Sequence, residues 1–498
     1  MSAVAGPVAP AAGLLDAVTA DLAAGWRFAG LMGTQRGDSV LLSAHLAGPG
    51  TIATREVLLP PGAREYPALT PALGAAFWYE RELRDLFGIV PAGHPRLEPL
   101  ILPLAGAGGP YPRPGAAGPA PAPLWPDEHA LPRHVLGPGL FTIPHGPVRS
   151  GVMESVEYLV ETPGEDIPHL RVRLFYKHRG VEKRFEQLGA ADGVLLAERT
   201  EGVASVAHAL AFCHAAERIA GVTQVPWRAA LVRVMHAELE RVAAHLDVAL
   251  RLADAAGLAV AAARFGLHKE RVLRLVGRMC GSRFGRGVVV PGGVSAMPMV
   301  GPADLLAETG RLEAAVTADA RALLGTPSFL DRLRGTGPLP AERAREHGAL
   351  GPVGKASGFA DDARLARPYD AYDGLRPAVA AEHATGDALA RLRLRFDELR
   401  QSFGLLGQAA AELGEAGEGP LRLACEAGTG RAVGWAEAAH GEVIYDLRLA
   451  DGHIARCRPR SPSFHNLVLF HEVFAGDILT DFPFIEASFG LSVAGAAL

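Results

Sequence analysis

Residues 198–217 combine a charged, glycine-broken opening with two histidines and a cysteine in the order ERTEGVASVAHALAFCHAAE. A metal bound by this stretch would need His208, Cys213 and His214 as ligands. With about 100° per residue on a helix, Cys213 lies about 140° from His208, and His214 lies about 120° from it in the opposite sense. These side chains cannot chelate one ion from one face, so a buried Ala/Leu-rich helix is predicted, with a small apolar Cys and two histidines that are either satisfied or lie at the rim. Chemistry here must come from the loop before the helix, which contains Glu201.

Composition limits the partners and the kinds of site. The chain has 498 residues, with 49 basic against 54 acidic side chains and no long polybasic run, so no nucleic-acid partner is expected. Its four cysteines form no CxxC pair, which argues against a zinc ribbon, an iron–sulfur site or a disulfide framework. Charged residues interrupt every long apolar stretch before the roughly 18 residues that a membrane helix needs, and no secretory signal is recognised. We therefore expect a cytoplasmic chain that does not itself span a membrane.

The elements that must position any site fall into two units. A Pro-, Gly- and Ala-rich stretch at 103–140 predicts a semi-extended linker, because this mixture forms neither helix nor sheet. Before it, domain 1–102 begins with a helix at LLDAVTADLAA and continues with strands at DSVLLSAHLA and TIATREVLLP. After it, domain 141–498 is predicted to start with a small antiparallel sheet and then to become mainly helical, with a strand-rich tail. The predicted fold class is α+β, with an excursion of loops and short helices near 330–375.

The end of the first unit is dense in charge: WYERELRDLFGIVPAGHPRLEPLILP, residues 78–103. The charges alone predict an amphipathic helix with exposed ion pairs and with Trp78, Leu83 and Leu86 turned inward. They do not explain the ordered string ERE, then D, then GI, then GHP. That string resembles the signature of the thirty-kilodalton subunit of respiratory complex I.

A second series of motifs runs through the rest of the chain. In order it resembles the forty-nine-kilodalton subunit of complex I and its relatives, the large subunits of [NiFe] hydrogenases. With both units fused, the chain looks most like the large subunit of energy-converting hydrogenases of the formate-hydrogenlyase type, or a fused complex I subunit. The motifs are IPHGPVRSGV, FYKHRGVEKRFE, the stretch 198–217, VRVMHAELERVAAHL, ERVLRLVGRMCGSRFGRGVVVPGGV and RPRSPSFHNL.

This resemblance implies where nickel would be bound. In the hydrogenases a CGxC pair follows the Glu-Arg of the loop, and a CxxC pair follows an Asp-Pro near the C-terminus. Soft thiolates suit nickel redox chemistry. The corresponding positions of this chain hold Glu201, Ala204, Pro483 and Glu486. Because no cysteine remains at any of them, we expect no metal centre.

The resemblance to complex I also implies a quinone site. There, a histidine precedes the Gly-Val of the loop that matches IPHGPVRSGV, and a tyrosine lies in the loop before the helix. This chain has Ser150 and Gly202 at those positions, and a serine hydroxyl cannot act as an acid near neutral pH as an imidazolium does. His145 is an alternative ligand, and Asp254 corresponds to the acidic partner, although a surface carboxylate is the simpler interpretation.

A set of carboxylates survives these losses. The family fold implies that Glu201 and Glu486 converge on the former metal cavity and that Glu182 of the HRGVE motif lies close by. Crowded carboxylates at a dry site cannot all ionise, so at least one is predicted to have a raised pKa and to share a proton, as in a proton relay. Alternatively, the glutamates form purely structural salt bridges with Arg179, Arg199 and Arg460. Magnesium on these oxygens is a further alternative.

The resemblance implies a function at the level of a complex. One hypothesis is an electron- and proton-coupling subunit of a complex I-like assembly on the cytoplasmic side of the cell membrane, attached peripherally through its partners. These would be an iron–sulfur small subunit that holds the cluster, a ferredoxin-like subunit and antiporter-like membrane subunits. No cofactor is expected on this chain itself, except for a quinone as the alternative acceptor. The second hypothesis is a noncatalytic scaffold that transmits conformational change in the same complex.

Overall fold

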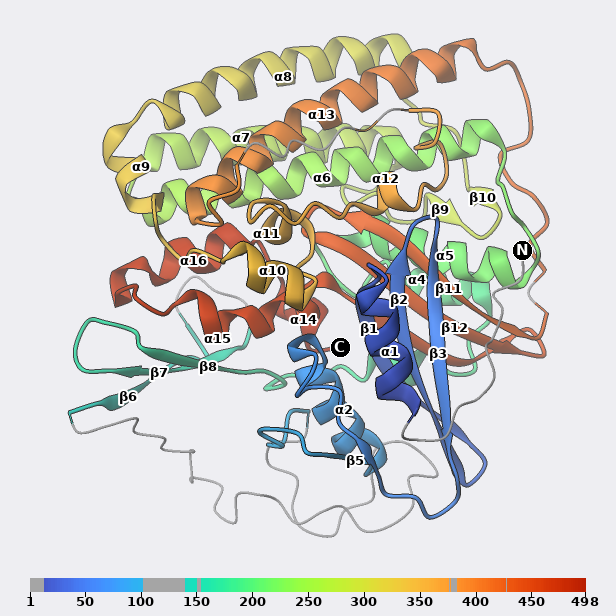
Figure 1. Ribbon diagram of the computed structural model, residues 1–498. Coiled ribbons are helices and arrows are strands. Elements are labelled where there is room, and N and C mark those ends of the chain that lie inside the picture. The colour runs from blue at the N-terminus through green and yellow to red at the C-terminus, as the bar shows by residue number, and fades with distance from the viewer. Residues whose placement is uncertain (1–12, 102–138, 150–153, 376, 378–382, 427) are drawn as a thin grey trace.

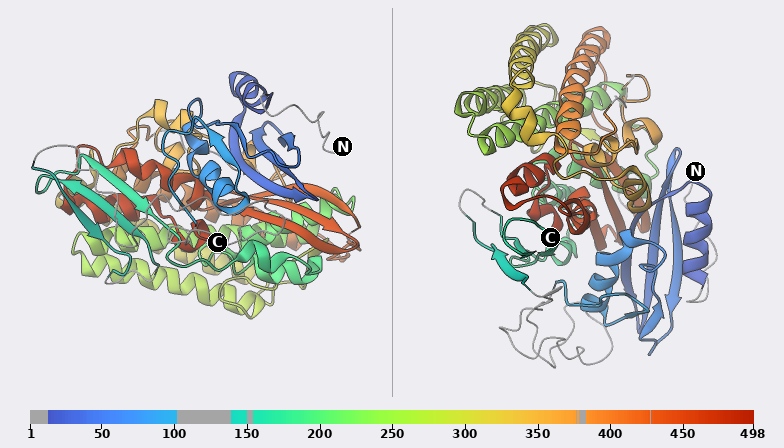
Figure 2. Two further views of the ribbon diagram at one scale, coloured as in Figure 1. Left: turned by 90° about the horizontal axis from the view of Figure 1, so that it is seen from below. Right: turned by 60° about the vertical axis from the view of Figure 1, so that its left-hand side comes forward.

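The computed structural model describes residues 13–101, 139–149, 154–375, 377, 383–426 and 428–498. The predicted linker, 103–140, lies almost wholly outside these residues, so the domain boundaries stay a prediction. Long helices gather at one side of the molecule and the N-terminal sheet at another, with a second antiparallel sheet between them (Figures 1 and 2). The predicted α+β fold class is confirmed. No helix within the described ranges is long and apolar enough to cross a membrane.

The N-terminal unit is an antiparallel sheet of order β1-β2-β3 covered by helices. The predicted helix and strands are confirmed. Nearly all of β1 is buried, because β1 also packs against β13 of the C-terminal sheet β11-β12-β13. A Cβ at Gly33 would lie 2.8 Å from the Phe87 ring and 2.9 Å from Leu83, so a side chain here would push α2 away. The elements are α1 (Gly13–Ala23), β1 (Arg27–Arg36), β2 (Ser39–Gly48), β3 (Thr51–Leu59), β4 (Glu65–Pro67), a 3-10 turn (Gly74–Ala76), α2 (Phe77–Phe87) and β5 (Val90–Ala92).

Helix α2 corrects the prediction of exposed ion pairs. Every residue from Trp78 to Phe87 is buried, including the five charged ones. Arg84 pairs with Asp85 at 3.0 Å within the helix. Other partners come from distant segments: Glu80 accepts the Leu69 N–H at 2.7 Å, and Glu82 pairs with Arg458 of β13 (His453–Arg460). The pattern of charges predicted the helix, but a helix that lies between two layers has no solvent-facing side.

The second unit begins with the predicted small antiparallel sheet, of order β6-β7-β8, and continues into long helices. Helix α6 is buried on most of its circumference because α5, α7, α13 and α16 all pack against it. The elements are β6 (Phe141–His145), β7 (Glu157–Thr162), β8 (His169–Arg173), α3 (Val181–Phe185), α4 (Ala190–Ala197), α5 (Ser205–Ile219), α6 (Trp227–Ala255), α7 (Ala259–Cys280), β9 (Val289–Val290), β10 (Gly293–Val294), α8 (Pro302–Leu324) and α13 (Ala388–Glu415).

Short helices occupy the predicted excursion, and the predicted strands of the tail form the sheet β11-β12-β13. Helix α5 packs on β11 and β12, which brings the loop before α5 close to the hairpin between these strands. The elements are α9 (Pro327–Leu333), α10 (Ala341–His347), α11 (Gly351–Lys355), α12 (Ala363–Ala366), β11 (Gly430–Ala438), β12 (Gly441–Ala450), β13 (His453–Arg460), α14 (Pro462–Asn466), α15 (Phe470–Val473), α16 (Phe482–Phe489), α17 (Val493–Ala496) and 3-10 turns at Leu467–Leu469 and Leu479–Asp481.

Candidate functional site

The loop before α5 places the Glu201 carboxylate in the interior, with no exposed surface. Ser461 Oγ donates to Oε2 at 2.8 Å and Ser463 Oγ donates to Oε1 at 3.0 Å. His208 Nε2 lies 3.0 Å from Oε2. His440 Nε2 lies 3.0 Å from Oε1 but at an angle too poor for a hydrogen bond. Two serines after β13, a helix and a hairpin thus surround one carboxylate.

His208 connects this carboxylate to a chain of hydroxyl groups. Its Nδ1 lies 2.9 Å from the hydroxyl of Tyr445, which lies 3.2 Å from Thr200 Oγ1. Burial lowers the pKa of His208, so the ring is neutral. Because an ionised carboxylate only accepts, Nε2 carries the proton and Nδ1 accepts from Tyr445. The predicted satisfied histidine on α5 is confirmed, and the hydrogen bonds run in one direction from Thr200 to Glu201.

The charge of Glu201 is decided by its donors. Burial alone would raise its pKa, but the charge of His440 and the hydrogen bond from His208 hold the pKa well below its usual range. The prediction was a raised pKa on at least one glutamate of the set, and Glu201 is not that one. Glu201 is an ionised group in a dry site.

The C-terminal segment closes this site. A Cβ at Gly495 would overlap the Glu201 carboxylate, so only glycine fits between α17 and the loop. Arg179 holds the two together, because its Nη2 donates to both Thr200 O and Ala494 O. Glu154 accepts the Val493 N–H at 2.8 Å and fixes the start of α17.

The other predicted carboxylates have partners different from those of Glu201. Glu486 on α16 forms a two-point ion pair with Arg149, at 2.7 and 2.9 Å, and accepts the Tyr158 hydroxyl at 2.8 Å. Glu182 pairs with Arg456 at 2.5 Å and Arg458 at 3.1 Å. Glu486 and Glu182 are therefore held by arginines, as the structural alternative expects, but not by the three arginines that were predicted.

Those three arginines have other roles. Arg199 is exposed, and its guanidinium lies 3.4 Å from the carboxylate of its chain neighbour Glu198. Arg460 pairs with Glu442 at 2.9 Å and donates to Ala29 O at 3.0 Å, which joins β13 to β1. Arg179 binds the carbonyls described above. The alternative that these three arginines pair with the predicted glutamates is therefore wrong in its partners, because the fold places other groups beside each arginine.

The predicted quinone ligands do not form one site in the described part of the chain. His145 is the last residue of β6 and is exposed. Its ring stacks on Tyr158 and makes an edge contact with Phe482. Asp254 is exposed near the end of α6, as the simpler interpretation expects. Ser150 lies outside the described residues. The structure does bring His145 and Glu486 together, because Arg149 contacts both, at 3.4 Å and 2.7 Å.

An apolar cavity of about 90 Å³ lies against Gly202 and Val203, and sequence reasoning missed it. His236 and Glu240, one turn apart on α6, line it together with three other charged residues: Asp247, Lys269 and Arg283. Burial lowers the pKa of His236 to about 4, and its Nδ1 has no hydrogen-bond partner among the described residues. Burial raises the pKa of Glu240 to about 8, although two backbone N–H groups of α5 bind it. The motif HAELE was visible in the sequence, but nothing in it marks a cavity.

Metal-ligand geometry is absent from the part of the chain that the structure describes: no group of three or more His, Cys, Asp or Glu side chains there could hold an ion. The four cysteines are free thiols. At the four positions implied for nickel ligands, Ala204 precedes α5 as its N-cap and Pro483 lies in the first turn of α16. Residues of this kind offer no donor for a soft metal, and the two glutamates are already hydrogen-bonded.

Comparisons with known proteins agree with both units. Residues 258–428 match the family described as respiratory-chain NADH dehydrogenase, 49 Kd subunit, and residues 28–112 match that of the 30 Kd subunit. Formate hydrogenlyase subunit 5 of Escherichia coli (strain K12) is 30% identical over 438 residues, which are 85% of this chain and 75% of the relative. The chain therefore belongs to the family that contains formate hydrogenlyase subunit 5 and the 49 Kd and 30 Kd subunits of NADH dehydrogenase.

Other members of the family are similarly related. The carbon monoxide-induced hydrogenase of Rhodospirillum rubrum is 30% identical over 354 residues, covering 70% of this chain and 96% of the relative. The NADH-quinone oxidoreductase C/D protein of Acidiphilium cryptum (strain JF-5) is 28% identical, with 71% and 62% covered. The predicted resemblance to fused complex I subunits and to formate-hydrogenlyase-type large subunits is confirmed.

A solved structure shares the family fold. A chain from the membrane-bound sulfane sulfur reductase, described as an archaeal respiratory membrane complex, superposes with a TM-score of 0.68 over 72% of this chain and 99% of that one. The two sequences are 23% identical. This likeness supports the fold and carries no further statement about activity.

Proposed function

We propose that the chain is the large subunit of a membrane-associated oxidoreductase complex related to complex I and the energy-converting hydrogenases. It couples electron transfer from an iron–sulfur small subunit to proton handling and ion translocation, without nickel. Membership in the family supports a place in such a complex. The observation that carries the proton-handling part is the hydrogen-bond chain that ends on the closed, ionised Glu201.

The chain of donors gives Glu201 the means to take part in proton movement. Thr200, Tyr445 and His208 all donate in the same direction, so a proton passing along them reverses each bond in turn. Gly495 and the C-terminal helix exclude water from the end of this chain. A proton that reaches the site therefore stays on a defined group until the surroundings change.

The remaining parts of the proposal concern the assembly. The chain sits peripherally on the cytoplasmic side of the cell membrane, bound to the iron–sulfur small subunit that holds the cluster, a ferredoxin-like subunit and antiporter-like membrane subunits. The same family likeness fits the alternative of a noncatalytic scaffold. Electron transfer through the assembled complex to an added acceptor distinguishes the coupling subunit from the scaffold. If the chain is only a scaffold, the rate of this electron transfer should not depend on Glu201.

Elemental analysis of the purified complex tests the metal part of the proposal. We expect iron from the partner subunit but no stoichiometric nickel, and neither uptake nor evolution of hydrogen. The reason is that the four positions implied for thiolate ligands hold two hydrogen-bonded carboxylates, an alanine and a proline. Stoichiometric nickel would contradict the proposal.

A second candidate function is quinone reduction at an altered site. The apolar cavity beside Gly202 favours it, because neutral His236 and the carboxyl of Glu240 offer two hydrogen-bonding groups to a carbonyl-bearing ring. The complex would then reduce a quinone analogue, and His236→Leu, which retains apolar bulk, would raise the KM for it. Equal reduction by both forms excludes this cavity as the quinone site.

A further inference from the structure

The turn between β11 and β12 connects three clusters of buried charge. His440, at its tip, faces Glu201. Glu442 binds Arg27 of the N-terminal unit at 2.6 Å and Arg460 at 2.9 Å. Glu437, its cross-strand neighbour, accepts the N–H of Ala363 of α12 in the helical domain. One short hairpin therefore touches the candidate site, the N-terminal unit and the helical domain.

Glu437 has too few hydrogen-bond donors for a buried carboxylate. The residue is 3% exposed. Oε2 accepts the Ala363 N–H at 3.0 Å, and Oε1 is buried without any hydrogen-bond partner in the described residues. An ionised carboxylate needs donors on both oxygens to offset its loss of water, whereas a protonated one does not.

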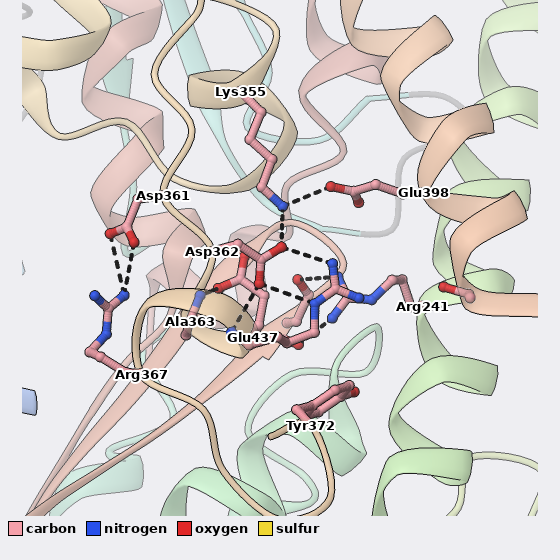
Figure 3. Close-up of polar contacts among 12 residues, drawn as sticks. Arg241, Lys355, Asp361, Asp362, Ala363, Arg367, Tyr372, Glu398 and Glu437 are labelled. Carbon is pink, nitrogen blue, oxygen red and sulfur yellow. Dashed lines mark hydrogen bonds and ion pairs between the residues drawn. The ribbon is translucent and has the colours of Figure 1, made fainter. Parts of the chain in front are cut away.

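Within the ion cluster around Lys355, cations and carboxylates balance without Glu437. Lys355 Nζ lies 2.7 Å from Asp362 and 2.8 Å from Glu398, as Figure 3 shows beside Glu437. Three cations (Lys355, Arg241 and Arg364) directly contact three carboxylates (Asp362, Glu398 and Glu238), with Arg364 Nη1 3.1 Å and Arg241 Nε 3.2 Å from Glu238. An ionised Glu437 would add a fourth negative charge.

The other charged and titratable groups around Glu437 do not supply the missing donor. Arg241 donates to the backbone carbonyl of Glu437 at 2.6 Å rather than to its carboxylate. The Tyr369 hydroxyl accepts the backbone N–H of Glu437 at 2.8 Å. Arg367 is already bound to Asp361 and Glu442, at 3.1 and 2.7 Å.

We propose that Glu437 is a proton-binding site, neutral in the resting protein, whose loss of a proton places an uncompensated charge at the root of the hairpin that carries His440. The O–H bond of the carboxyl breaks, its electron pair stays on the carboxylate, and the proton passes to water. Burial, with the nearby charge of Asp362, raises the pKa of Glu437 to about 8. Deprotonation thus falls within reach of physiological pH.

The new charge acts on the hairpin by repulsion from Asp362 and attraction to Lys355. His440 follows Glu437 by three residues in the same hairpin. A movement of Glu437 therefore changes the distance between His440 and the Glu201 carboxylate. Any role of this coupling in turnover rests on the proposed function. Proton binding by Glu437 does not.

The test compares Glu437→Gln, which mimics the neutral acid, with the wild-type full chain in its assembled complex. The stability that comes from a raised carboxyl pKa is complete below the unfolded value and is lost as pH rises through the folded value. The wild-type unfolding constant should therefore rise relative to that of the variant by roughly a hundredfold between about pH 6 and pH 9.

The control is Asp446→Asn, which leaves the ions around Glu437 unchanged. Burial alone would raise the pKa of Asp446, but the charge of Arg431 and its hydrogen bond hold that pKa well below its usual range. The control should therefore be destabilised by a constant factor over the same pH range. A constant ratio for Glu437→Gln, with the variant less stable throughout, would overturn the proposal.

Infrared spectroscopy provides a second measurement that needs no unfolding. In the difference spectrum of wild type minus Glu437→Gln, a carboxylic-acid carbonyl band should be present at low pH and disappear as pH rises through about 8. Glu240, whose pKa is also raised to about 8, contributes to both proteins and cancels in the difference. A difference spectrum without this band would overturn the proposal. Neither measurement depends on turnover, so the proposed function can fail while this inference stands.

Discussion

Glu201 and Glu437 both have buried carboxyl groups, yet Glu201 is ionised and Glu437 is neutral. Glu201 accepts from Ser461, Ser463 and His208 and faces His440. Glu437 accepts a single backbone N–H among the groups that the structure describes. Burial opposes ionisation in both places, so the difference comes from the donors that each fold segment supplies. Depth alone does not predict the charge of a carboxylate in this chain.

Glu201→Gln should have the largest effect. Coupled turnover of the assembled complex is expected to fall at least tenfold if Glu201 relays protons, while the chain still folds. The amide cannot accept as strongly from the two serines and His208, so the free energy of unfolding should decrease by about 2–4 kcal/mol. Turnover per folded complex and chemical denaturation measure the two effects, and unchanged turnover would refute the relay.

The pH dependence of this variant sharpens the contrast with Glu437. The folded-state pKa of Glu201 is lowered, so the stability that its charge provides is present above the unfolded value near 4.5 and is lost as pH falls below it. The wild-type advantage over Glu201→Gln should thus shrink in acid, whereas the stability of Glu437→Gln relative to wild type should grow as pH rises towards about 8 and then level off. Parallel pH profiles for the two variants would show that they share one environment.

Gly495→Ala should have an intermediate effect. Its added Cβ overlaps the Glu201 carboxylate, so the C-terminal helix must move or the carboxylate must turn away from its serines. We expect a loss of about 1–3 kcal/mol in the free energy of unfolding. Gly202→Ala, beside Glu201 in the loop before α5, is the control, because a Cβ there meets no atom of the described residues within 4 Å. Equal thermal stability of the two variants would show that the tail does not close the site.

Glu486→Gln should have the smallest effect. Arg149 and Tyr158 hold this carboxylate near the surface, where an ion pair contributes at most about 1 kcal/mol to stability. Turnover per folded complex should stay close to that of the wild type. A drop as large as that of Glu201→Gln would mean that the two glutamates act together, despite their separate partners.

The amino-acid sequence by itself determined the family, the α+β class and most elements, because hydrophobic periodicity and motif order are local features. It also identified the loop before α5 and the replaced ligand positions, and it predicted correctly that His208 and His214 are hydrogen-bonded in a buried helix. It could not tell that the charges of α2 are buried, since that depends on β13 covering a helix some 370 residues away in the chain.

Only the tertiary structure decided which partner each charged group has. Glu201 meets Ser461 and Ser463, which lie 260 and 262 residues further along, and Glu486 meets Arg149 instead of the predicted arginines. Glu437 carried no signal in the sequence at all. Its charge state depends on which donors the hairpin, α11, α12 and α6 bring to one place. A carboxylate takes its pKa from the groups around it in space, and residues hundreds of positions apart supply them here.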